Sequence, residues 1–205
     1  MNLFQVLVSG GWIMIPIFLS SVAIIAIGVS RSMVLRREVN SLITFVDRWK
    51  RAPAGTDTSS FKASAKMGPS ISADMTSVFE GEKPSRQESL NSVENMGRQH
   101  VYNLEAGLGT LATLSAVTPL LGFLGTVTGM IKAFMQIQKL GGNVNANVLA
   151  GGIWEALVTS AAGLSVGIVA LIIHNYLAGQ VRTSARLIEQ TGEITVKLLE
   201  NSDED

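Results

Sequence analysis

The sequence predicts an all-α integral membrane protein with three transmembrane helices, two of which extend into the cytoplasm. Three intervals without a charged side chain support this fold class, namely residues 1–30, 106–131 and 156–181. Each is longer than the roughly 20 residues that a helix needs to cross a bilayer. Helices buried in a soluble protein would carry charges on their exposed faces, and these intervals have none.

Composition excludes several functions. The formal net charge is zero, so no basic excess indicates nucleic-acid binding. Cysteine is absent, which removes disulfides, thiolate metal sites and cysteine nucleophiles. The two histidines, His100 and His174, are far apart in the sequence, so a histidine-rich metal site is not expected. We therefore expect neither a metal nor another cofactor.

The first half of the chain divides into two predicted segments. Residues 1–30 hold the N-terminus and the first transmembrane helix, which has neither the basic start nor the cleavage site of a signal peptide. Residues 31–106 form a helical segment with an amphipathic helix over 34–49 and a loop near 53–84, rich in Ser, Thr, Gly and Pro. Ser85 and Glu88 form a capping-box pattern, so a helix should start there and lead into the second transmembrane helix without a strong break.

The second half holds the other two transmembrane helices. The second spans 107–131 and is followed by a short connection over 132–155. The third spans 156–178 and continues as a C-terminal helix within 179–205, up to the acidic tail at 200–205. The two helices expected to extend beyond the bilayer are thus the second, at its start, and the third, at its end.

The distribution of Lys and Arg predicts the orientation. Residues 31–105 contain eleven of these basic side chains, whereas the connection between the second and third spans contains only Lys132 and Lys139. Basic residues concentrate on the cytoplasmic side of membrane proteins. We therefore expect the N-terminus outside, the segment over 31–106 in the cytoplasm, the connection between the second and third spans outside, and the C-terminus in the cytoplasm.

Small and hydroxyl-bearing residues dominate one face of the second helix and recur in the third. Such faces let helix backbones approach closely, so helix packing is their simplest interpretation. The predicted packing residues are Thr118, Gly122, Gly125, Gly129 and Gly163.

Glu155 stands at the outer entrance of the third helix and is the only carboxylate between residues 106 and 188. Acids at the membrane edge often belong to ion pathways. An interfacial glutamate near a helix N-terminus, favoured by the helix dipole, is an equally good interpretation.

Gly163, Ser165 and Gly167 spell G-x-S-x-G, which elsewhere marks a serine nucleophile on a strand-to-helix turn. Here the motif lies inside an uninterrupted apolar helix, and His174 would lie about 13 Å away along the axis. We therefore assign no catalytic residue.

Several stretches resemble the MotA/TolQ/ExbB proton-channel family. Residues 118–130, TPLLGFLGTVTGM, and the following Ala133-Phe134 are similar to its second-helix signature. Residues 155–164, EALVTSAAGL, are similar to its third-helix signature, and residues 11–16 and 35–37 resemble its first helix and exit. The third helix lacks the Ile-Pro that commonly follows in the family, since Val169 follows Ile168.

This resemblance implies a bacterial inner-membrane subunit that assembles as a ring, a homopentamer embedded in membrane lipid around a dimer of single-span ExbD/TolR-like partners. Protons would pass next to an aspartate of the partner. The family's pore-lining hydroxyls map onto Thr126 and Ser160 and its acidic residue onto Glu155. Because Thr159 precedes Ser160, either of these two hydroxyls could face the pore.

The implied function is an ExbB-like proton-channel subunit, not an enzyme, that uses the proton motive force to energise TonB-dependent transport across the outer membrane. A TolQ-like subunit acting with a TolA-like protein in envelope maintenance, or a gliding motor subunit, is the nearest alternative. A non-conducting membrane scaffold, in which the small faces only pack helices, belongs to a different class.

Overall fold

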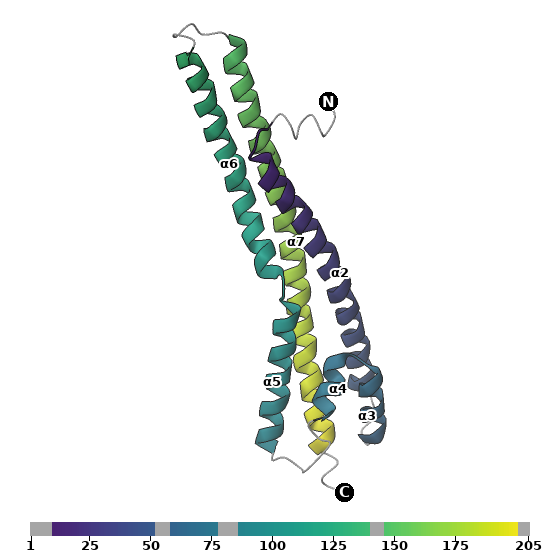
Figure 1. Cartoon of the computed structure of the whole chain (residues 1–205). Coiled ribbons are helices and arrows are strands. Elements are labelled where there is room, and N and C mark those ends of the chain that lie inside the picture. Colours follow the sequence, from purple (N-terminus) through teal and green to yellow (C-terminus); the bar gives the residue numbers. More distant parts are fainter. Residues whose placement is uncertain (1–9, 52–57, 78–85, 140–145, 201–205) are drawn as a thin grey trace. The chain divides into compact units, whose positions relative to one another are not determined.

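The computed structural model describes residues 10–51, 58–77, 86–139 and 146–200 (Figure 1). All secondary structure in these ranges is helical, as predicted. The helices are α2 (Met14–Lys50), α3 (Thr58–Met67), α4 (Ser70–Ser77), α5 (Arg86–Leu104), α6 (Leu108–Lys139) and α7 (Ala146–Glu200). Ser85 of the predicted capping box lies outside the described residues.

Three helical stretches are long and apolar enough to cross a membrane, which confirms the prediction of three candidate spans. They lie in α2, in the stretch that includes α6, and in α7, and the most apolar window of each has a mean hydropathy of 1.9, 1.6 and 2.3. No more than 28% of any of these windows is buried within the chain. Apolar surface of this extent needs lipid or other subunits to cover it.

Of the two spans predicted to continue as longer helices, the third does so in α7, whereas the second does not. The second span does not continue from the preceding helix, because residues 105–107 form a turn and Gly107 adopts a φ of 83°. Glycine reaches this left-handed conformation without the penalty that a Cβ imposes. α7 runs for 55 residues, as the prediction for the third helix required. The unexpected continuous helix is α2, which runs for 37 residues through both its apolar and its amphipathic parts.

The prediction of a loop near 53–84 is wrong over much of that range, because α3 and α4 occupy residues 58–67 and 70–77. The serine-rich composition favours a loop, but packing overrides it. Phe61 of α3 is fully buried and lies edge-on to Trp49 of α2, with ring centroids 4.8 Å apart. The Trp49 indole also donates a hydrogen bond to Ser64 of α3 at 3.3 Å.

The connection expected over 132–155 is also mostly helical. α6 continues to Lys139 and α7 begins at Ala146. A charge interrupts the apolar run at Lys132, but it does not interrupt the backbone hydrogen bonds of a helix. Lys132 and Glu155 therefore lie on helices and not in a loop.

The chain forms two compact units. The first comprises residues up to Val29 together with 107–175. Here α6 and α7 run side by side, and the start of α2 lies against them (Figure 1). Ile13, Met14 and Ile17 form a buried cluster that contacts one residue of α6 and two of α7, namely Leu121, Ala162 and Val166.

The second unit comprises residues 30–106 and those from Tyr176 onward. Polar contacts join its helices. The Arg36 guanidinium donates to the Tyr176 hydroxyl at 3.0 Å, and Glu38 lies 3.0 Å from a ring nitrogen of His100. The Lys50 ammonium donates to the side-chain oxygen of Gln190 at 3.0 Å. These contacts supplement the aromatic cluster around Trp49.

Candidate functional site

The contact between α6 and α7 is built from residues with almost no side chain. A Cβ placed on Gly163 would lie 2.7 Å from the Cα of Gly122 and 2.8 Å from the carbonyl oxygen of Thr118. A Cβ on Gly122 would lie 3.1 Å from the Cα of Gly163. The two backbones therefore touch directly, and glycine is needed on both sides.

The same close approach continues toward the connected ends of the two helices. A Cβ on Gly125 would lie 2.5 Å from the Cβ of Thr159, and one on Gly129 would lie 3.0 Å from that of Ala156. The predicted packing residues thus all lie on the α6–α7 contact. These distances also define the antiparallel register, because Gly125 faces Thr159 and Gly129 faces Ala156.

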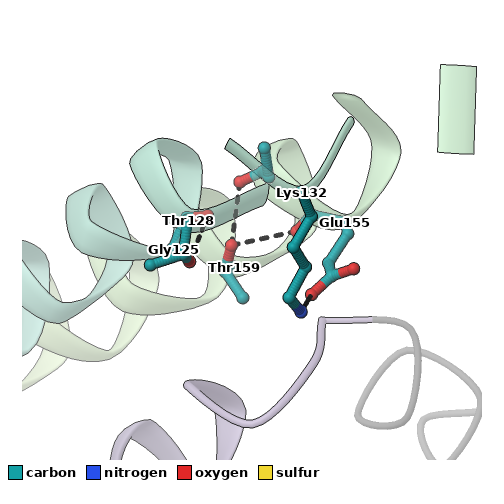
Figure 2. A network of polar contacts seen from close by, with 6 residues as sticks. Gly125, Thr128, Lys132, Glu155 and Thr159 are labelled. Carbon is teal, nitrogen blue, oxygen red and sulfur yellow. Dashed lines mark hydrogen bonds and ion pairs between the residues drawn. The ribbon is translucent and has the colours of Figure 1, made fainter. Parts of the chain in front are cut away.

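Thr159 lies inside this contact. Its side chain is only 1% exposed. Its hydroxyl donates to the backbone carbonyl oxygens of Glu155 and Ala156, both at 2.9 Å (Figure 2). The structure therefore encloses Thr159 within a single chain.

Thr126 and Ser160 are placed differently, because each is only half-buried. The Thr126 hydroxyl donates to the carbonyl oxygen of Phe123 at 2.6 Å. Thr126 follows Gly125, which faces Thr159, so the register brings Thr126 and Ser160 to about the same level of the helix pair. Both residues are partly exposed on the first unit.

Glu155 forms an ion pair that the sequence analysis missed. The Lys132 ammonium of α6 lies 2.5 Å from the Glu155 carboxylate of α7, and their side chains are 46% and 25% exposed (Figure 2). The pair could have been suspected from one signal, since each charge borders a charge-free interval. Glu155 lies about 7.5 Å along the helix axis from Ser160, as five residues at about 1.5 Å each require.

The turn before α2 lies over the same site. A Cβ on Gly10 would lie 3.0 Å from the Cγ2 of Thr159. Gly11 adopts a φ of 67°, and a Cβ there would lie 3.1 Å from the carboxyl carbon of Glu155 and 3.3 Å from the Lys132 ammonium. The ion pair is therefore bordered by α6, by α7 and by the turn before α2.

The polar groups available here are hydroxyls, one carboxylate and one ammonium. Within the described ranges, histidine and acidic side chains do not gather into a group that could hold a metal ion. The G-x-S-x-G stretch lies in the uninterrupted helix α7, where Gly163 packs on Gly122 and Gly167 packs on the Pro119 ring. The two glycines of this motif thus have packing contacts.

Three apolar helices long enough to cross a bilayer, with a polar site between two of them, define the class of multi-pass membrane proteins. Comparison with known families agrees with this class. The chain belongs to the MotA/TolQ/ExbB proton channel family, whose sequence model matches residues 62–190, well over half of its length. The predicted family resemblance is thereby confirmed for the second and third helices, whereas the first helix lies outside the matched residues.

Relatives of this chain carry names of biopolymer transport proteins. It is 31% identical over 121 residues to the biopolymer transport protein ExbB of Neisseria gonorrhoeae. These residues make up 58% of this chain and 54% of that protein. It is 39% identical over 79 residues to ExbB of Pseudomonas putida, covering 38% and 24%. A protein described as an ExbB homolog of Methanothermobacter thermautotrophicus is 33% identical over 111 residues, covering 54% and 39%. The matches therefore span about a quarter to a half of these relatives.

Proposed function

We propose that this chain is an ExbB-like subunit of a proton channel in a bacterial inner membrane, which uses the proton motive force to energise TonB-dependent transport. The observation that carries the proposal is the position of two hydroxyls in a chain of a proton channel family. Thr126 and Ser160 stand at about one level of the paired helices and are partly exposed, and Glu155 lies at the edge of the third span, about one and a half helix turns from Ser160.

The burial of the hydroxyls supports a choice between Thr159 and Ser160. A side chain that is 1% exposed in one chain cannot line a lumen formed between several chains. Ser160 is half-buried and can do so. The proton path therefore runs past Thr126 and Ser160 toward Glu155, and Thr159 is a packing residue. Hydroxyls can relay a proton without placing a permanent charge in lipid.

The exposed apolar faces support assembly. Large apolar side chains of α2, α6 and α7 are exposed, among them Phe18, Ile25, Phe123 and Ile172. Five copies would form a ring around a dimer of single-span ExbD/TolR-like chains, whose aspartate accepts the proton. A TonB-like protein would then couple the motion to transport across the outer membrane. The N-terminus would be periplasmic and the C-terminus cytoplasmic, as the basic residues predict.

The energy available sets a limit on each step. One proton that crosses a potential of 100 mV supplies about 2.3 kcal/mol. This is comparable to a few weak contacts between subunits. The motor therefore needs several transfers or small steps for each large movement of its partner.

Proton flux through the reconstituted complex tests the proposal. The chain is co-purified with the single-span protein encoded next to it, and proton entry into liposomes is measured under an applied potential. Thr126→Ala and Ser160→Ala should lower the flux, and Thr126→Ser should retain most of it. Full activity of a variant that combines Thr126→Ala, Ser160→Ala and Glu155→Ala would refute the pathway.

Thr113→Ala is the matched control. Thr113 lies on the same helix, is exposed, and donates to a backbone carbonyl oxygen at 3.0 Å, as Thr126 does at 2.6 Å. Its replacement should leave the flux unchanged. Stable monomers or dimers in native mass spectrometry would contradict the ring, and the receptor genes nearby would separate a TonB-dependent role from a TolQ-like one.

A further inference from the structure

Gly11 and Lys132 border the Glu155 carboxylate on two sides. The Lys132 ammonium supplies the opposite charge at 2.5 Å. Gly11 supplies a backbone without a Cβ, in a left-handed conformation that residues with side chains rarely adopt. An added Cβ would meet the nearer carboxylate oxygen of Glu155 directly and approach the Lys132 ammonium to 3.3 Å.

We propose that Lys132 and Gly11 are positioning residues that hold the Glu155 carboxylate at the end of the proton path. This inference rests on the proposed function, because it concerns the same site. Lys132 compensates the charge of Glu155. Without it, the carboxylate would be an uncompensated charge at the membrane edge. Gly11 allows the turn before α2 to close over the pair, so that the carboxylate faces the ammonium and does not swing into solvent.

Replacing Lys132 and replacing Gly11 should have different consequences. Loss of Lys132 removes the countercharge but leaves space for the carboxylate. A side chain at residue 11 keeps both charges but displaces the carboxylate oxygen that the ammonium binds. A Cβ on the neighbouring Gly10 would instead meet the Cγ of Met14 and lie 3.0 Å from the Cγ2 of Thr159, so the two consecutive glycines face different side chains.

The reactivity of the Lys132 amine measures the ion pair independently of proton flux. The full complex is treated with an amine-acylating reagent, and the modification rates of Lys132 and Lys139 are compared by mass spectrometry. Glu155→Gln and Gly11→Ala should each raise the rate at Lys132 by roughly two- to fivefold, as expected when a partly exposed ion pair is lost. The rate at Lys139, in the last turn of α6, should not change.

Proton flux then tests the functional part. Gly11→Ala and Lys132→Met should lower the flux about fivefold, and Lys132→Arg should retain most of it because the countercharge remains. Gly151→Ala is the matched control, since this residue lies one turn before Glu155 and a Cβ there would have no neighbour within 4 Å. Its flux should be that of the unmodified chain.

A second variant separates the steric effect from backbone strain. Glu155→Asp shortens the acid by one methylene and makes room for a Cβ at residue 11. The combined variant Gly11→Ala/Glu155→Asp should recover flux relative to Gly11→Ala alone, whereas a loss caused only by the left-handed backbone would not recover.

The two readouts fail separately. An unchanged Lys132 rate in both Gly11→Ala and Glu155→Gln would overturn the positioning inference whatever the flux. If Glu155→Gln raises the modification rate of Lys132, but Glu155→Gln, Thr126→Ala and Ser160→Ala all keep normal proton flux, the proposed proton path is refuted. The ion pair between Lys132 and Glu155 would then still be supported. Normal flux in Lys132→Met beside a reduced flux in Glu155→Gln would overturn the role of Lys132 alone.

Discussion

Replacing Gly163 by alanine should force α6 and α7 apart. The new Cβ would lie 2.7 Å from the Cα of Gly122, 2.8 Å from the carbonyl oxygen of Thr118 and 2.9 Å from the backbone nitrogen of Gly122. All three atoms belong to the backbone of α6, so no side chain can turn aside. Carbon atoms prefer separations of about 3.5–4.0 Å, so the helices must separate by roughly 0.8 Å.

A separation of this size weakens every contact along the shared face. A gap of 0.5–1 Å forfeits about a quarter to a half of the attraction between facing atoms. Overpacking typically costs about 1–3 kcal/mol. A fall of about 2–4 °C in the thermal midpoint per kcal/mol applies to soluble domains of 150–250 residues, and we expect a similar order for this assembly in detergent.

Gly151→Ala provides the reference for the gain in helix propensity alone. It lies on the same helix, and a Cβ there would contact nothing within 4 Å. In water, alanine exceeds glycine in helix propensity by about 0.8–1.0 kcal/mol, so this control should be neutral or slightly stabilising. A thermal midpoint of Gly163→Ala equal to or above that of Gly151→Ala would refute the close backbone contact.

Three further predictions concern buried side chains. Phe61→Ala should destabilise the second unit by about 3–5 kcal/mol, measured as earlier proteolysis within residues 58–77, whereas Met67→Ala at a site that is 93% exposed should have no effect. Ser184→Ala should raise the thermal midpoint. In the described part of the chain, the Ser184 hydroxyl is the one buried side-chain oxygen that lacks a hydrogen-bond partner. A lower midpoint would show that this hydroxyl is bonded. Thr159→Val should leave proton flux unchanged, since its hydroxyl donates only to helix carbonyls, and a loss as large as that of Ser160→Ala would contradict its role in packing.

The sequence predicted the elements whose cause is local. Charge-free intervals marked the three spans, because lipid excludes charge along a whole helix. The spacing of Gly122, Gly125 and Gly129 placed them on one helical face, since three- and four-residue steps return to the same side. Both features depend only on residues near each other in the chain.

The features that were missed depend on distant residues. Helix α3 forms in a serine-rich stretch because Phe61 packs on Trp49, which belongs to α2. The Lys132–Glu155 pair depends on the register of two antiparallel helices, and 23 residues separate its members. The position of Gly11 over this pair also requires α2 to lie against α6 and α7. Apart from the charges that border two charge-free intervals, no local pattern indicates these contacts.

The three tryptophans differ in burial, so their intrinsic fluorescence can report on different parts of the chain. Trp49 is buried in the aromatic cluster of the second unit, whereas Trp12 and Trp154 are 61% and 49% exposed and adjoin Gly11 and Glu155 in the sequence. Brominated lipids should therefore quench the emission of Trp12 and Trp154 and spare that of Trp49. With Trp49 replaced by phenylalanine, the remaining fluorescence would follow events beside the ion pair during proton flow, without an attached dye.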